Sequence, residues 1–125
     1  MDLKLEFLDL ELTIAQLATV DDLESLFSKA RFFSLTKTDD EISLVIDTAC
    51  APSNQFGSTG WNAFKIIGPL DFSLVGILEK VIHPLSKNNI SVFTVSTFDT
   101  DYILVKKEQV SSAQKILSSQ FKILI

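Results

Sequence analysis

Two short polar stretches hold the residues whose chemistry could bind a small charged molecule. The first reads G-P-L-D-F-S, from Gly68 to Ser73, and a helical pattern follows it. Unpaired backbone N–H groups and the helix dipole favour an anion at such a helix start, Gly68 allows close backbone approach, and the Ser73 hydroxyl could donate. The second reads S-T-F-D-T-D, from Ser96 to Asp101, and its acids and hydroxyls suit a cation.

These stretches, with one glycine expected a turn into the helix, supply the candidate binding residues: Gly68, Asp71, Phe72, Ser73, Gly76, Ser96, Thr97, Asp99 and Asp101. Each also has a purely structural explanation. Asp71 could simply cap the helix, Gly76 could permit tight helix–sheet packing, and the acids could bond the backbone of their own turn. The hydroxyls of Ser96 and Thr97 fit a strand end without any ligand.

Composition narrows the classes of function. The chain has 125 residues, is 46% hydrophobic and carries a net charge of −5, with a pI near 4.7. That charge disfavours nucleic acids and anionic membrane surfaces, and no apolar run approaches the roughly 18–20 residues of a membrane helix. The N-terminus is acidic where a signal peptide would be basic. We therefore expect a soluble cytoplasmic protein.

Few residues could support catalysis or hold a metal. Cys50 and His83 are the only residues of their types, so a zinc site is not expected and Cys50 fits a small buried hydrophobe. The carboxylates fall mostly in turns and caps, and no phosphate loop is present. The sequence predicts a protein without enzymatic activity and without a cofactor.

A duplicated segment dominates the organisation of the chain. Residues 33–45 read F-S-L-T-K-T-D-D-E-I-S-L-V and residues 93–105 read F-T-V-S-T-F-D-T-D-Y-I-L-V, at a constant offset of 93 − 33 = 60. Each copy predicts strand, acidic turn and strand, so two related hairpins are expected. Such a repeat points to a symmetric module with an apolar seam rather than to one active-site cleft.

Hydrophobic spacing predicts the remaining elements. Leu3–Leu17 alternates with one slip of phase, which indicates one bulged strand or two short ones. A short helix follows Asp21 and Asp22, with Leu23, Leu26 and Phe27 expected inward. A second helix is expected from Asp71, and the face expected to point inward includes Phe72, Val75, Leu78, Ile82 and Leu85; Asn88 and Asn89 should end it. The other expected elements are strands at 31–37, 42–48, 61–67, 90–97, 102–106 and 121–125 and a helix at 108–119.

The expected fold is therefore α+β, with an abbreviated unit at 1–50, a linker at 51–60 and a complete β-α-β-β-α-β unit at 61–125. The first unit shows β-α-β-β and lacks an evident second helix and final strand. Apolar residues on both faces of the strand at 90–97 suggest that both faces are covered, by the other half or by another chain.

Long motifs in the second half resemble a known family. W-x-x-F-K-I-x-G-P-L-D-F-S-L-x-G-I-L (Trp61 to Leu78) and I-S-V-F-T-V-S-T-F-D-T-D-Y-I-L-V (Ile90 to Val105) are similar to a small bacterial family of tandem ACT domains. F-x-S-L-T-K-T-x-D-E-I-S-L-V (Phe32 to Val45) resembles its N-terminal signature. The same hairpin block resembles the ACT pairs of aspartokinases and of the eukaryotic cytosolic arginine sensor.

The resemblance implies two ferredoxin-like ACT units and an amino-acid-binding regulatory module. A ligand carboxylate would then sit at Gly68–Ser73 and its ammonium near Asp99 and Asp101. Since no enzyme is fused, the output would pass through a partner protein, and the protein is expected to form a homodimer. A dimerisation or interaction module of ACT-like fold that binds no metabolite is the alternative.

Overall fold

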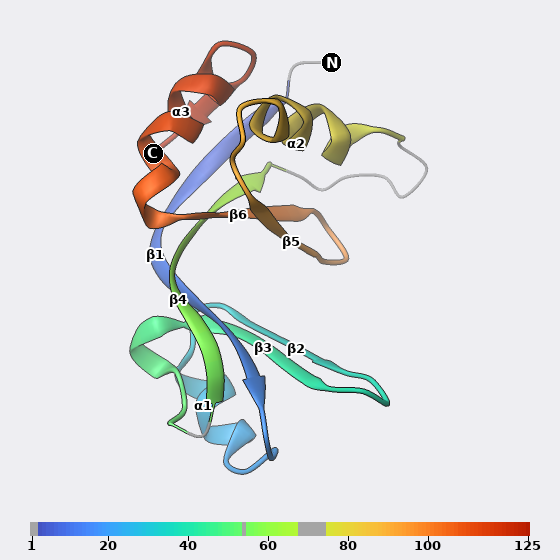
Figure 1. Cartoon of the computed structure of the whole chain (residues 1–125), viewed down its shortest axis with the longest axis vertical. Coiled ribbons are helices and arrows are strands. Elements are labelled where there is room, and N and C mark those ends of the chain that lie inside the picture. The colour runs from blue at the N-terminus through green and yellow to red at the C-terminus, as the bar shows by residue number, and fades with distance from the viewer. Residues whose placement is uncertain (1–2, 54, 68–74) are drawn as a thin grey trace. The chain divides into compact units, whose positions relative to one another are not determined.

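The computed structural model describes residues 3–53, 55–67 and 75–125 (Figure 1). The elements along the chain are β1 (Lys4–Leu17), α1 (Leu23–Lys29), β2 (Phe33–Lys37), β3 (Ile42–Asp47), the 3-10 turn η1 (Thr48–Cys50), β4 (Gln55–Ile66), α2 (Ile77–Lys87), β5 (Val92–Ser96), β6 (Asp101–Lys106), the 3-10 turn η2 (Lys107–Gln109), α3 (Val110–Ser118) and β7 (Lys122–Leu124).

The chain forms two compact units, and one of them is discontinuous in sequence. The C-terminal unit joins Met1–Asp9 to Asn62–Ile125, and the N-terminal unit is Leu10–Trp61. Consequently β1 and β4 each contribute residues to both units. The stretch expected as a linker, 51–60, contains the first half of β4. Domain boundaries at 50 and 61 stay a prediction.

The C-terminal unit has the predicted order β-α-β-β-α-β, running β4, α2, β5, β6, α3 and β7. Its strands lie in the order β7-β1-β4-β6-β5, so the start of β1 is inserted between β7 and β4. β7 pairs in parallel with β1, from Lys4 opposite Lys122 to Glu6 opposite Leu124. The helices α2 and α3 contact each other.

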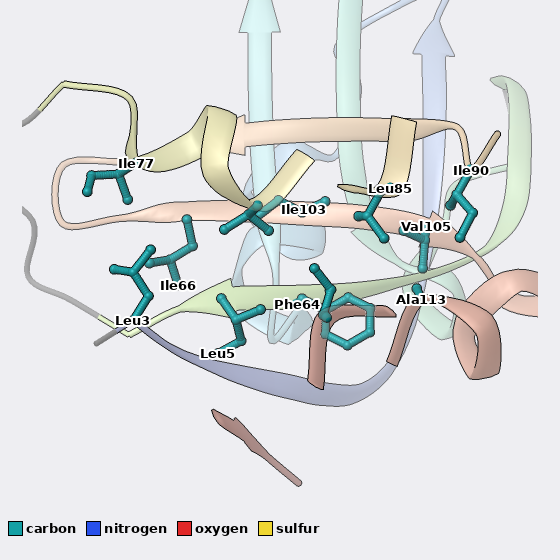
Figure 2. Packing of buried hydrophobic residues seen from close by; sticks show 12 residues of the cluster. Leu3, Leu5, Phe64, Ile66, Ile77, Leu85, Ile90, Ile103, Val105 and Ala113 are labelled. Carbon is teal, nitrogen blue, oxygen red and sulfur yellow. The ribbon is translucent and has the colours of Figure 1, made fainter. Parts of the chain in front are cut away.

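One apolar core holds this unit together (Figure 2). Strands and both helices point side chains into it, and Phe64, Leu5 and Leu117 are fully buried. Burying a side chain of this size contributes about 1.5–3 kcal/mol. The buried members of the core are Leu3, Leu5, Phe64, Ile66, Ile77, Val81, Leu85, Ile90, Ile103, Val105, Ala113 and Leu117.

The N-terminal unit has the strand order β2-β3-β1-β4, with α1 between β1 and β2. Its final strand comes from the first half of β4, inside the expected linker, and η1 stands where a second helix would be. Sequence analysis missed this strand because its Gly-, Ser- and Thr-rich sequence resembles a loop. A smaller core of Ala15, Leu17, Leu44 and Ile46 joins α1 to the strands, and Cys50 packs against it half-buried.

The two hairpins are confirmed, but the offset that relates them is 59 rather than 60. β2 and β3 span 33–37 and 42–47, while β5 and β6 span 92–96 and 101–106. Phe33 pairs with Ile46, and the equivalent pair in the second hairpin is Val92 with Val105. The residues matched by identity, Phe33 and Phe93, are therefore one position apart, and successive residues of a strand point to opposite faces.

Helices α1 and α2 differ from the prediction in different ways: α2 in where it begins, α1 in the exposure of one side chain and in its cap. α2 begins at Ile77, after Gly76 in the left-handed conformation (φ 78°), so Gly76 precedes the helix instead of lying a turn inside it. Val75, expected inward, is 89% exposed. The expected start of the helix at Asp71 lies outside the described residues. In α1, Phe27 is 63% exposed although it was expected inward, and Asp22 at the N-cap makes no side-chain cap bond.

Candidate functional site

The predicted cation-binding stretch forms a tight turn between β5 and β6. The Thr97 N–H donates to the Thr100 carbonyl at 2.8 Å, which leaves Phe98 and Asp99 as the two loop residues. The Thr97 hydroxyl reinforces the turn: it donates to the Thr100 carbonyl (3.1 Å) and accepts from the Thr100 N–H (3.3 Å). Because this turn is tight, Phe98 (80% exposed) and the exposed Asp99 stand at its tip.

Thr100 fixes this turn to the neighbouring strand, and sequence analysis missed it. Its side chain is buried (4% exposed), and its hydroxyl donates to the backbone carbonyl of Ile66 at the end of β4. A buried hydroxyl is stabilised by such a bond, since leaving it unpaired would cost free energy. In the sequence, Thr100 is seen only as a threonine between two acids. That pattern does not indicate whether the threonine side chain is buried or exposed.

The side chains of Ser96 and Asp101 meet across the base of the turn. They are a cross-strand pair, and the Ser96 hydroxyl donates to the Asp101 carboxylate. Asp101 is half-buried, so one carboxylate oxygen is held while the group remains partly accessible. The adjacent Tyr102 ring lies 5.9 Å from the Lys65 ammonium, measured to the ring centre. Because of its bond to Ser96, the Asp101 carboxylate is an acceptor held in one place rather than a mobile surface acid.

The predicted anion-binding stretch is only partly described. Gly68, Asp71, Phe72 and Ser73 lie outside the described residues. Beyond them, the first intrahelical bond of α2 runs from the Lys80 N–H to the Gly76 carbonyl at 3.1 Å. The N–H groups of the residues before Lys80 therefore have no partner within the helix and face its start. Figure 2 shows Ile66 and Ile77 at the same end of the core.

The structure thus places Ser96, Thr97, Asp99 and Asp101 together at one end of a hairpin whose turn is anchored to the end of β4. Gly76 lies at the start of α2, and no contact between it and the hairpin is described. The binding role of all nine candidates stays a prediction. In the N-terminal unit, open hollows lie beside α1, near Leu23 and Leu26.

The described residues give little support for a metal site or for a membrane-spanning helix. Over 3–53, 55–67 and 75–125, no three His, Cys, Asp or Glu side chains gather closely enough to hold a metal ion. His83 is exposed on α2 and lies 3.6 Å from Glu79. Among the helices that the structure describes, none is long and apolar enough to span a membrane.

The model of the ACT domain family matches residues 57–119. The chain belongs to the ACT domain family. A human protein, CASTOR3P, is 38% identical over 117 residues, which cover 82% of this chain and 72% of that protein. The bovine (Bos taurus) cytosolic arginine sensor for mTORC1, subunit 1, is 30% identical over 107 residues, or 77% of this chain. This ACT chain spans only 32% of that sensor subunit.

Solved structures agree with this assignment. Protein Atu0741 from Agrobacterium tumefaciens has a TM-score of 0.87 and 34% identity, covering 99% of this chain and 93% of that one. The regulatory subunit of aspartate kinase from Thermus thermophilus has a TM-score of 0.66, covering 94% and 97% of the two chains, at 7% identity. The second likeness concerns the fold alone. Both confirm the expected α+β ACT architecture of the chain.

Proposed function

We propose that this ACT protein is a regulatory module that binds a free amino acid, has no catalytic activity of its own and acts in the cytoplasm through a partner protein. The observation that carries the proposal is the anchored hairpin end, where Thr100 holds the turn on Ile66 and Ser96 holds the Asp101 carboxylate. The membership of the family and the similarity to a cytosolic arginine sensor support this reading.

In the proposed site, opposite charges of the ligand are held by different elements. The α-ammonium would bond Asp101 and Asp99, assisted by the hydroxyls of Ser96 and Thr97. The α-carboxylate would bind backbone N–H groups between Gly68 and the start of α2, with Asp71, Phe72, Ser73 and Gly76 lining that side. Preorganisation supports the assignment, because an acceptor already fixed by Ser96 loses little conformational freedom on binding.

A thermal-shift screen of the twenty amino acids on dialysed protein tests this function. Ligand that binds only the native state raises stability by about 2.7 kcal/mol when its concentration is a hundred times Kd. We expect one amino acid, or a small chemically related group, to raise the melting temperature. If none does so at millimolar concentration, the protein is the alternative, an ACT-like interaction module without a metabolite.

Variants of the two hairpins locate the binding site. Asp101→Asn keeps an acceptor for Ser96 but removes the charge, and we expect amino-acid binding to weaken at least about tenfold with the fold intact. Asp99→Asn should also weaken it. Asp40→Asn is the matched control, because Asp40 holds the place of Asp99 in the first hairpin. Equal effects of Asp99→Asn and Asp40→Asn would contradict the placement of the site.

A further inference from the structure

Helix α1 leaves apolar side chains uncovered. None of its 7 residues is buried, although Leu23 and Leu26 pack against the small core of the N-terminal unit. Val20, just before the helix, is 49% exposed, and Phe27 within it is 63% exposed. A surface helix normally turns its apolar stripe into a core. Part of the apolar surface at α1 is therefore available to another molecule.

Open hollows lie along the same helix. One has a volume of about 690 Å³, and its lining includes Val20, Asp22 and Leu23. Another, of about 450 Å³, has Asp22, Leu26 and Pro52 in its lining. Because Asp22 borders both, the hollows adjoin at the start of α1. Each combines apolar side chains with carboxylates, and an apolar centre beside a polar rim is the usual composition of a protein–protein interface.

The net charge of the chain is concentrated in the unit that carries α1. Leu10–Trp61 contains eight acidic and three basic residues, a net charge of 3 − 8 = −5, which equals that of the whole chain. The exposed acids Asp21, Asp22 and Glu24 line the hollows, beside the basic Lys29. This surface attracts a cationic partner. It repels nucleic acids, anionic membranes and the same surface of a second copy.

We propose that α1 and the hollows beside it bind a basic segment of another protein, in which a bulky apolar side chain is flanked by lysine or arginine. The apolar side chain enters the hollow at Val20 and Leu23, and the basic side chains pair with Asp21 and Asp22. The apolar contact supplies most of the affinity, and the charges select the partner and speed its association. This inference rests on the proposed function, because it names the kind of protein through which the module acts.

Selection from a library of short random peptides displayed on phage tests the chemistry of the occupant. The target is the full chain without added amino acid. We expect the selected peptides to be enriched in lysine and arginine next to leucine, isoleucine or phenylalanine. Binding of such a peptide should shift the backbone amide NMR signals of residues 19–29. A selection that yields no binding peptide, or only peptides without basic residues, would overturn the proposal.

Charge-neutralising variants locate the contact. Asp21→Asn, Asp22→Asn and Glu24→Gln, combined in one protein, should raise the Kd of a selected peptide about tenfold, because three attractive charges are lost. Asparagine suits position 22, since it tolerates the left-handed conformation that Asp22 adopts (φ 60°). Far-ultraviolet circular dichroism should therefore be unchanged.

The matched control removes the same charge from the first hairpin turn of the same unit. Asp39→Asn, Asp40→Asn and Glu41→Gln, combined, should change the Kd less than about twofold, because solvent and salt screen charges outside the contact. Equal effects of the two triple variants would show a general attraction to the acidic unit and would refute the site.

An apolar substitution completes the test. Val20→Ser should raise the Kd about fivefold, because the side chain that enters the hollow loses an apolar contact. Leu35→Ser is the control, since Leu35 is also exposed (39%) but does not line these hollows. If Val20→Ser instead dissociates a dimer in sedimentation equilibrium, a second copy occupies the surface and the proposal fails.

Failure of this inference can be told apart from failure of the proposed function. An amino acid that raises the melting temperature, together with a peptide selection that fails, would refute the α1 surface alone. Peptide binding that responds to the variants as expected, with no amino acid affecting the melting temperature, would refute the amino-acid site and support the α1 surface.

Discussion

Left-handed backbone conformations mark several ends of elements in this protein. Asn89 has φ 60° directly after α2, where the Asn89 N–H bonds the Ser86 carbonyl and the Ile90 N–H bonds the Leu85 carbonyl, both at 3.0 Å. This is a Schellman motif, and the buried side chains of Ile90 and Leu85 belong to the same core. The prediction that asparagine ends this helix is confirmed.

Asn89→Gly should stabilise the protein by about 0.5 kcal/mol and Asn89→Ala should destabilise it by about 1 kcal/mol, because only glycine adopts φ 60° without a steric cost. Urea unfolding measures both changes. Asn88 is the matched control: its φ is −102° and its side chain donates to the Pro84 carbonyl at 2.7 Å. Stabilisation by Asn88→Gly equal to that by Asn89→Gly would contradict the conformational explanation.

Threonines rather than acids organise both hairpin turns. The Thr38 hydroxyl accepts from the Glu41 N–H at 3.2 Å, and the Thr97 hydroxyl accepts from the Thr100 N–H at 3.3 Å. These two bonds are equivalent at an offset of 59. The acids at the turns, which sequence analysis emphasised, are therefore not needed for these bonds, and this leaves Asp99 and Asp101 available for the proposed ligand.

At the scale of elements, the buried Asp47 joins the end of β3 to the segment between α1 and β2. It is 5% exposed, and its carboxylate accepts from the backbone N–H groups of Arg31 (2.9 Å) and Phe32 (2.7 Å). The short α1 has no buried residue of its own. The Asp47 carboxylate therefore helps to hold the return of the chain from α1 into β2.

Asp47→Ala should lower the free energy of unfolding by about 2 kcal/mol, because two partly buried N–H groups lose their acceptor. Asp47→Asn keeps one acceptor oxygen and should cost less. Chemical denaturation with two probes measures both variants, and Asp40→Ala in the exposed turn serves as a control. If Asp47→Ala costs no more than Asp40→Ala, Asp47 does not hold this segment.

Strong periodicity made the hairpins and the β-α-β-β-α-β order of the C-terminal unit predictable. Segments with few apolar residues were not predictable from periodicity. The first half of β4 reads Q-F-G-S-T-G-W, and its Ser and Thr side chains are exposed, so strand pairing rather than side-chain burial determines its conformation. Gly60 within it has φ 81°, which indicates a local bulge.

The two hairpin turns were predictable from the sequence, but which of their residues are equivalent was not. The match at an offset of 60 aligned Asp39 with Asp99, whereas the strand pairing makes Asp40 the equivalent residue. The register of each hairpin is set by its two-residue turn. A match of residue types between the two copies does not reveal that register. Thr100 was missed because its importance comes from burial against Ile66, a contact between residues 34 positions apart.

At the scale of the whole molecule, the N-terminal unit is nested within the sequence of the C-terminal unit. The C-terminal unit takes Leu3 and Leu5 into its core, and β7 pairs with the start of β1. The Ile67 N–H bonds the Lys4 carbonyl at 2.9 Å, and continuing that antiparallel register brings Asp9 opposite Asn62. The two segments of this unit could therefore be joined by a hairpin turn.

A chain in which Asp9 is joined to Asn62 through Asn-Gly should fold cooperatively, since that dipeptide suits a two-residue hairpin turn. Residues 61–125 alone should not, because they lack Leu3, Leu5 and the strand that pairs with β7. Thermal melts followed by near- and far-ultraviolet circular dichroism distinguish the two. Cooperative melting of 61–125 alone would show that the first strand is dispensable.

The parallel pairing of β7 with β1 also has a mechanical consequence. Lys4–Glu6 begin one strand and Lys122–Leu124 end the other, so the two attachment points lie at opposite ends of the ladder. A force that pulls on the two attachment points would load all the hydrogen bonds of the β1–β7 ladder in shear at the same time. It would not break them one after another. Fused between two larger bodies, this short pair of strands would serve as a mechanical clamp that protects everything folded between its ends.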